Sequence, residues 1–242
     1  MRMSKLSISV GVLTWNAHRT LENTMESYKR CGLLDTVNDV CIFAQEAKQA
    51  DYKIAHHYGS DIILSDYNVG IGKGLSTLAH AAETDYILLL ENDWVVLPKY
   101  QEIVYDEIQT AMQFIKDGKA DVVKMRSRYD FGDPLYTLQY NGREMDSPKH
   151  LFECVHWREN PEEVYPEHIK KDPETGMYYA NSRYANQTNN PCIYKKEFYI
   201  KNISPFSGEG NELEGKIDGW WQEQNFTVAH RHGLFTHYRI DR

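Results

Sequence analysis

The sequence has few cysteines, no long basic run and no apolar run of transmembrane length. Its four cysteines are scattered over 242 residues without a CxxC pair, so neither a disulfide framework nor a cysteine-ligated zinc site is expected. The net charge is −8 at pH 7 and no basic stretch offsets it, which argues against a broad nucleic-acid-binding surface. The basic amino terminus precedes an alternating segment, not the apolar core of a signal peptide. We therefore expect a cytoplasmic protein without a transmembrane segment or a nucleic-acid partner.

Three common catalytic motifs are also missing. The glycines at 70, 72 and 74 do not have the GxxxxGK[ST] spacing of a phosphate-binding loop. No GxGxxG follows the first apolar run, where a dinucleotide-binding fold would carry it. The histidines at 230, 232 and 237 are not spaced as HExxH. These absences argue against P-loop nucleotide hydrolases, nicotinamide-dependent dehydrogenases and zinc proteases.

The most informative stretch that is present is YILLLENDW, residues 86–94. Its continuous apolar run is typical of a strand that is buried on both faces of a parallel sheet. Glu91 and Asp93 follow this run, and would lie at the carboxyl edge of the sheet, where open α/β folds bind ligands. Two carboxylates there suit a hard divalent cation held together with substrate phosphates. A strand that ends in a solvated acidic turn is the alternative at this point.

Short apolar runs alternate with helical patterns through about residue 126. The runs lie at 6–13, 40–44, 61–65, 86–90 and 121–125, and amphipathic helical patterns separate several of them. This alternation predicts an α/β protein with a mostly parallel sheet flanked by helices. Residues 127–190 lack clear periodicity and are expected to form a lid or binding loop. A helix over 209–224 and a strand or hairpin over 227–240 are expected to follow.

Four landmarks occur in order over residues 6–97. The first run ends in LTWN, residues 13–16; the second ends in QE, residues 45–46; NVGIG, residues 68–72, precedes a helix; and END, residues 91–93, ends the fourth run. Together they resemble the GT-A fold nucleotide-sugar glycosyltransferases, most closely family 2. The chain departs from the family pattern at Glu91, which replaces the first Asp of Asp-x-Asp, and at Glu46, which replaces another Asp.

This resemblance implies a GT-A (Rossmann-like) domain over 1–242, with a nucleotide-sugar-binding half (1–126) and a less regular acceptor-binding and catalytic half (127–242). It implies a nucleoside diphosphate sugar donor, with UDP or GDP, and the donor would contact Thr14, Asn16, Glu46, Asn68, Gly70, Lys73, Glu91 and Asn92. It also implies Mn²⁺ or Mg²⁺, which would bind Asp93 and His237, with His230 as the alternative histidine. A metal against the diphosphate stabilises the departing negative charge.

The family's acidic general base lies at the start of a late helix, which implies Glu214, Glu212 or Asp218 here. Such a base would take the proton of a hydroxyl on a glycan or other acceptor in an inverting transfer. Favourable charge at a helix amino terminus is the competing explanation for these carboxylates. Two other functions stay open: a sugar-phosphate nucleotidyltransferase, whose glycine-rich loop after the first strand is absent, and a non-catalytic sugar- or protein-binding module. The presence of Asp93, Glu214 and His237 argues against the second of these.

Overall fold

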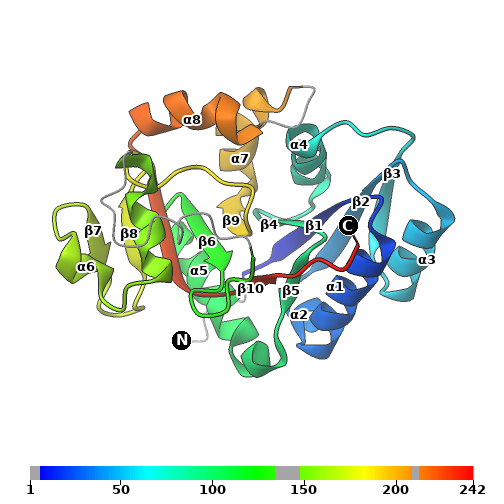
Figure 1. Cartoon of the computed structure of the whole chain (residues 1–242), viewed down its shortest axis with the longest axis horizontal. Helices are drawn as coiled ribbons and strands as arrows, with labels where there is room; N and C mark the ends of the chain where they lie inside the picture. The colour runs from blue at the N-terminus through cyan, green and yellow to red at the C-terminus, as the bar shows by residue number, and fades with distance from the viewer. Residues whose placement is uncertain (1–5, 134–147, 209–212, 242) are drawn as a thin grey trace.

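The computed structural model describes residues 6–133, 148–208 and 213–241. Within these residues the strands form one ten-stranded sheet, in the order β3-β2-β1-β4-β9-β6-β10-β8-β7, with β5 paired to β10 (Figure 1). The sheet therefore runs through both halves of the chain.

The first half forms the parallel core of the sheet. Its strands are β1 (Ile8–Trp15), β2 (Asp39–Gln45), β3 (Asp61–Ser65) and β4 (Tyr86–Glu91), and β1 pairs in parallel with both β2 and β4. The connecting helices are α1 (His18–Arg30), α2 (Leu33–Thr36), α3 (Gln49–His57) and α4 (Ile71–Ala81). Parallel pairing brings the carboxyl ends of β1, β2 and β4 to one edge, and their polar turns meet there.

The second half makes the sheet mixed. Its strands are β5 (Trp94–Val96), β6 (Val122–Arg126), β7 (Ile169–Lys171), β8 (Tyr178–Asn181), β9 (Cys192–Lys195) and β10 (Thr227–His237). Strand β9 is antiparallel to both of its neighbours, β4 and β6, whereas β10 is parallel to β6 and antiparallel to β5 and β8. The remaining helices are α5 (Val104–Lys116), α6 (Pro161–Val164), α7 (Lys196–Asn202) and α8 (Leu213–Glu223), with 3₁₀ helices η1 (Pro98–Ile103), η3 (Pro148–His156) and η4 (Ser204–Phe206).

Helices cover both faces of the sheet, and each face has its own apolar core. Because successive side chains of a strand point to opposite faces, Leu88 and Leu90 belong to one core and Ile87 and Leu89 to the other. The first core packs against α1, α2 and α5, and the second against α4, α7 and α8, which lie together along the top of Figure 1. Burial on both faces explains why the strands read as continuous apolar runs.

Two expectations need correction. Residues 148–190 are not a structureless loop, because they contain η3, α6, β7 and β8; residues 134–147 lie outside the described part of the chain. These strands are only three and four residues long, and strands this short leave no periodic pattern in a sequence. The amphipathic pattern between the runs at 86–90 and 121–125 predicts one long helix that Pro98 opens, but this segment begins as the 3₁₀ helix η1 and becomes α-helical at Val104.

The helices of the described residues include none that is long and apolar enough to cross a membrane. The four cysteines all lie within those residues and form no disulfide.

Candidate functional site

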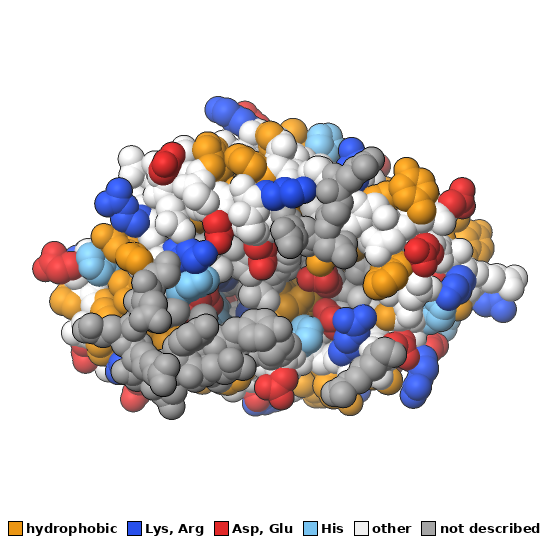
Figure 2. Space-filling view, turned by 45° about the horizontal axis from the view of Figure 1, so that its top comes forward, with side chains coloured by type: hydrophobic (Ala, Val, Ile, Leu, Met, Phe, Trp, Pro, Cys, Tyr) orange, Lys and Arg blue, Asp and Glu red, His pale blue; other side chains and the backbone are white. Residues whose placement is uncertain are grey.

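A pocket of about 230 Å³ lies at the carboxyl edge of the parallel core. It is lined by Leu13, Thr14, Trp15, Gln45, Asn68, Ile71, Glu91, Asn92, Asp93 and Arg239. The polar turns after β1, β2 and β4 thus meet where the sequence predicts a ligand site. Figure 2 shows one face of the molecule with a hollow near its centre, around which acidic, basic and histidine side chains gather.

The turns after β1 and β2 are fastened to each other at the rim of this pocket. Asn16 and Glu46 both adopt the left-handed backbone conformation, with φ of 50° and 49°, which a non-glycine residue seldom does. Asn16 Nδ2 donates to Glu46 Oε2 at 2.7 Å, and Lys48 Nζ donates to Asn16 Oδ1 at 2.7 Å. Neither Asn16 nor Glu46 is among the residues that line the pocket.

The loop before α4 is shaped by side-chain contacts to its backbone. Asn68 Oδ1 accepts a hydrogen bond from Gly70 N at 2.8 Å, and the buried Gln45 accepts one from Val69 N at 2.7 Å. Gly70 has a φ of 87°, which favours glycine at this position. Lys73 lies on the exposed side of α4 and does not line the pocket.

Helix α1 supports the acidic turn after β4. Asn92 Nδ2 donates to the carbonyl of Ala17 at 3.3 Å, and the carbonyl of Asn92 accepts from Thr24 Oγ1 at 2.6 Å. Tyr28 Oη donates to the carbonyl of Trp94 at 2.7 Å. The side-chain amide of Asn92 therefore stabilises the turn. Asp93 is 5% exposed, and its carboxylate faces a different segment of the chain.

That carboxylate meets His237, which comes from the end of β10. His237 Nε2 lies 3.2 Å from Asp93 Oδ2, and the imidazole ring packs against Trp94 with 5.0 Å between ring centroids. The other ring nitrogen, Nδ1, forms a hydrogen bond with the carbonyl oxygen of Asp133. Gly132 permits this contact, because a Cβ there would lie 2.1 Å from the carbonyl oxygen of His237.

The protonation of the Asp93–His237 pair follows from these contacts. A carbonyl oxygen only accepts, so Nδ1 carries a proton and Nε2 faces a carboxylate oxygen that also only accepts. Burial lowers the pKa of His237, but the hydrogen bond and the charge of Asp93 outweigh it and raise the pKa above its usual 6.5. The geometry therefore requires positive charge between the two groups, supplied by a second ring proton or by a bound cation.

Glu91 adds to the negative charge of the pocket. Burial, followed by the charges of Asp93 and Glu214, raises the pKa of Glu91 to about 7, although His237 and Arg239 act in the opposite direction. The first cause shows that the Glu91 carboxylate is poorly solvated, and the second shows that the neighbouring negative charges are not fully compensated. A cation in this pocket would relieve that repulsion.

The residues present are suited to a divalent metal. A carboxylate and an imidazole nitrogen are both ligands that Mn²⁺ accepts, and a ligating histidine commonly donates its other N–H to a carbonyl, as His237 does to Asp133. Within the described residues no third His, Cys, Asp or Glu completes a cluster that could hold a metal by itself. A metal here would need further oxygen ligands from a phosphate group or water.

His230, the alternative histidine, lies elsewhere. It is fully buried, and its Nε2 contacts the carbonyl oxygen of Arg126 at 2.7 Å. Arg126 in turn donates to the carbonyls of Phe131 and Gly132 at 2.9 and 3.2 Å, and its guanidinium lies 5.0 Å from the Trp94 ring. His230 and Arg126 therefore support the loop that holds His237.

Of the two candidate bases that the structure describes, Glu214 is the one whose charge affects the acidic turn. It is exposed in the first turn of α8, its Oε1 accepts from Asn189 N at 2.6 Å, and its charge reaches Glu91. Gly72 lets α4 approach this helix, since a Cβ on Gly72 would lie 3.3 Å from Leu213 Cβ. Asp218 instead forms an ion pair with Lys149 at 2.6 Å, and Glu212 lies outside the described residues.

Five residues that line the pocket were not predicted as ligand contacts: Leu13, Trp15, Gln45, Ile71 and Arg239. Trp15 is 46% exposed at the end of a buried strand, and as a tryptophan within the LTWN motif it could have been recognised as a ligand contact. Arg239 had no local signal, because it reaches the pocket only through the path of the chain after β10.

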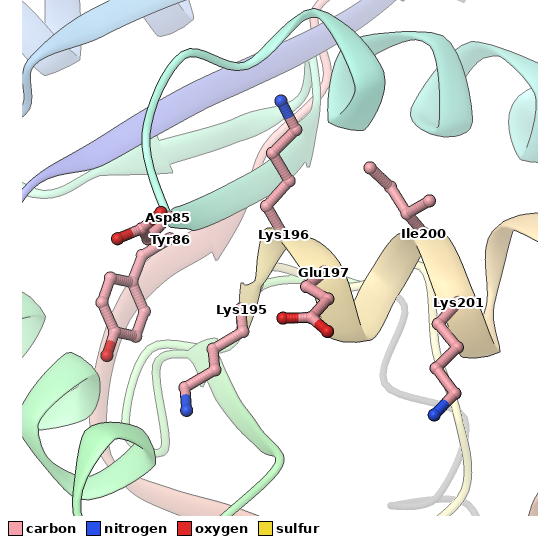
Figure 3. A pocket seen from close by; sticks show the side chains of 7 residues that line it. All are labelled: Asp85, Tyr86, Lys195, Lys196, Glu197, Ile200 and Lys201. Atoms are coloured by element: carbon pink, nitrogen blue, oxygen red, sulfur yellow. The ribbon is translucent and has the colours of Figure 1, made fainter.

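A larger and more open pocket, of about 710 Å³, lies at the opposite end of β4. Asp85, Tyr86, Lys195, Lys196, Glu197, Ile200 and Lys201 line it (Figure 3). Its three lysines do not converge, because Lys196 points away from Lys195 and Lys201 and donates to the carbonyl of Ala82 at 2.5 Å. Its size alone therefore does not make it a ligand site. The smaller pocket is the better candidate, because carboxylates and an arginine line it together.

Comparison with solved structures identifies the fold. S. aureus TarS 1–349 aligns with a TM-score of 0.56 and 14% identity, over 96% of this chain and 60% of that chain. The same protein in complex with UDP-GlcNAc gives 0.55 and 14%, over 98% and 60%. A longer TarS structure gives 0.58 and 13%, over 96% and 37%.

The chain thus has the GT-A fold of TarS, which confirms the predicted fold class, and it spans 60% or less of the length of these structures. No protein-family model matches the sequence, and no curated protein matches it.

Proposed function

We propose that this protein is a metal-dependent glycosyltransferase that moves a sugar from a nucleoside diphosphate sugar, with UDP or GDP, to a hydroxyl of a glycan or other acceptor. The observation that carries the proposal is the Asp93–His237 pair at the carboxyl edge of a GT-A sheet. TarS, which has the same fold, has been crystallised with UDP-GlcNAc and with UDP. Residues 1–126 would bind the donor, and 127–242 would supply the acceptor side and the base.

The nucleoside would lie over the turns after β1 and β2. Trp15 offers an exposed aromatic face at the mouth of the pocket, which suits stacking with a base. Thr14 Oγ1 is buried and has no hydrogen-bond partner among the described residues, as expected of a group that bonds to a ligand. Asn68 and the backbone before α4 would border the ribose and phosphates.

Asp93 and His237 would hold the metal, and Mn²⁺ suits this donor set better than Mg²⁺ because it accepts imidazole nitrogen. When bound, the metal would neutralise the charge that develops on the departing diphosphate. Asp133 keeps Nε2 of His237 directed at Asp93, and Trp94 limits the movement of the ring. The chain therefore orients both ligands before any donor arrives.

Glu214 is the base that this arrangement favours. It is exposed, so an acceptor hydroxyl can reach it, and the backbone N–H of Asn189 holds one of its oxygens. The other oxygen would take the acceptor proton as the bond to the sugar forms, in an inverting transfer. Asp218 is less suited to this role, because Lys149 neutralises it.

The test is a thermal-shift screen of UDP, GDP and their common sugars, each with and without Mn²⁺, followed by an assay of nucleotide release. A ligand that binds only the folded state stabilises it by RT ln(1 + [L]/Kd), or about 2.7 kcal/mol at roughly 100 Kd. We expect one nucleotide family to stabilise the protein only when metal is present. Release of the nucleoside diphosphate would establish transfer or hydrolysis of the sugar.

Other outcomes identify the alternatives. Formation of a sugar nucleotide from a sugar phosphate and a nucleoside triphosphate would establish a nucleotidyltransferase. Binding without turnover in the presence of varied acceptors would indicate a binding module. Absence of stabilisation across the panel would refute the donor site.

A further inference from the structure

The segment that follows β10, Tyr238–Asp241, runs from the candidate metal site to α1, and we call it the strap. It is anchored at both ends. Tyr238 N donates to the carbonyl of Asp93 at 2.7 Å, while Ile240 N and Asp241 N donate to Thr20 Oγ1 at 3.1 and 2.9 Å. Figure 1 shows this end of the chain passing beside α1.

The contact between Asp241 and Thr20 is reciprocal. Asp241 Oδ2 accepts from the backbone N–H of Thr20 at 3.0 Å, and Thr20 Oγ1 accepts from the backbone N–H of Asp241. Helix α1 begins at His18 without a side-chain cap from its own N-cap residue, so a carboxylate 221 residues away satisfies an otherwise unpaired donor. The logic is that of a capping box, formed between distant segments. Thr20 is fully buried, which shields the contact from water.

The strap holds Arg239 over the pocket. Arg239 lines it together with Glu91 and Asp93, and its Nε donates to the carbonyl of Asp241 at 2.9 Å. That bond fixes the plane of the guanidinium, while Nη1 and Nη2 have no hydrogen-bond partner in the part of the chain that the structure describes. A planar guanidinium with two outward donors suits the oxygens of a phosphate group.

The negative charge of the pocket explains why a guanidinium is needed to bind a phosphate group there. Glu91 and Asp93 would repel a diphosphate, and the ion held by Asp93 and His237 would offset only part of that repulsion. We propose that Arg239 binds the diphosphate of the donor and that Thr20 and Asp241 are positioning residues that hold it in place. This inference rests on the proposed function, since it requires a nucleoside diphosphate in the pocket.

The test is calorimetric titration with UDP and, in parallel, GDP, each with Mn²⁺, and NMR titration with uridine and guanosine. Arg239→Gln should raise the Kd of the diphosphate about tenfold or more, as expected for loss of a charge-assisted contact, and Arg239→Lys should recover part of the loss. Binding of the nucleoside, which has no phosphate, should not change. Because Arg239 is exposed, its replacement should leave the fold intact.

The positioning role has its own matched pairs. Asp241→Ala and Thr20→Val should each weaken diphosphate binding several-fold without weakening nucleoside binding, whereas Asp241→Asn and Thr20→Ser retain the acceptor oxygen and should bind normally. Arg239→Gln combined with Asp241→Ala should bind no more weakly than Arg239→Gln alone, because the strap acts through the arginine.

Three results would overturn the inference. If the wild type binds UDP or GDP and Arg239→Gln binds it equally well, the arginine has no such role, and the proposed function survives. Equal weakening of nucleoside and diphosphate in the Asp241 and Thr20 variants would indicate general damage to α1 instead of positioning. If the wild type binds neither diphosphate, the proposed function fails together with this inference.

Discussion

Glu91 provides a direct test of the electrostatics of the site, through the pH dependence of folding in Glu91→Gln. The pKa of Glu91 is raised from 4.5 to about 7, first by burial and then by Asp93 and Glu214. The folded protein therefore retains a proton that the unfolded chain has already released. Stability that this group provides is fully present below pH 4.5 and is lost as the pH rises through 7.

The size of the effect follows from the two pKa values. A change from 4.5 to about 7 corresponds to roughly 3 kcal/mol, which is an upper value because the Glu91 side chain is only partly buried. Glutamine has nearly the same shape and does not titrate. The free energy of unfolding of the wild type, relative to Glu91→Gln, should therefore fall by about 1–3 kcal/mol between pH 5 and pH 8.

Urea unfolding of both proteins with a chelator present, at each pH unit from 5 to 8, measures this difference. Glu102→Gln removes one exposed charge that does not line the pocket and controls for the change in net charge. Addition of Mn²⁺ at pH 8 should favour the wild type, because the cation would offset the repulsion. Parallel stability curves for wild type and Glu91→Gln would refute the claim that negative charge accumulates without compensation in the pocket.

Three further predictions concern the metal, the base and the loop that carries Asp133. Asp93→Asn should abolish the Mn²⁺-dependent part of nucleotide stabilisation while the protein remains folded, as thermal shifts with and without metal would show; undiminished metal dependence would contradict the assignment. Glu214→Gln should lower the transfer rate about 10²–10⁴-fold with little change in donor Kd. Asp218→Asn loses only a partly exposed ion pair and should retain activity. The reverse pattern would identify Asp218 as the base. Gly132→Ala places a Cβ 2.1 Å from the carbonyl oxygen of His237, at a φ of 68°. Urea unfolding should therefore show a free energy of unfolding lower by about 1–3 kcal/mol, and titration should show weaker Mn²⁺ binding. Normal values for both would mean that the loop adjusts freely.

Most elements of the first half could be predicted, because burial on both faces of the sheet leaves a continuous apolar pattern in the sequence of each strand. Strands such as β4 read as continuous apolar runs, and α4 and α5 show one apolar side. Helix α3 gave no such signal, since only Asp51, Ile54 and Ala55 are buried in it. Strand β8 is short and buries only Tyr178 and Ala180, so its alternation is too brief to distinguish from a loop.

The residues of the candidate site likewise divide into those that could be predicted from the sequence and those that could not. Thr14 lies near the carboxyl end of β1, and Asn68 and Asp93 lie in the turns after β3 and β4, so their meeting at one edge is a consequence of parallel topology and could be predicted. The role of Asn92 could not, because its amide bonds to Ala17, a contact between segments 75 residues apart. Arg239 was missed for the same reason, since no local pattern encodes the return of the chain to α1.

The turn at Asp93 is the point where both halves of the chain act on one residue. Its backbone carbonyl accepts from Tyr238 N, and its carboxylate faces His237, so two residues of the closing segment determine its position and its charge environment. The same segment is anchored on Thr20 of α1, the helix that also supports the turn through Thr24. Because α1 contacts the turn on one side and the strap on the other, a shift of either is transmitted to Asp93. The proposed metal ligands, Asp93 and His237, are therefore held by a closed ring of contacts. Breaking that ring at Thr20 should loosen the site while the apolar cores on both faces of the sheet remain packed.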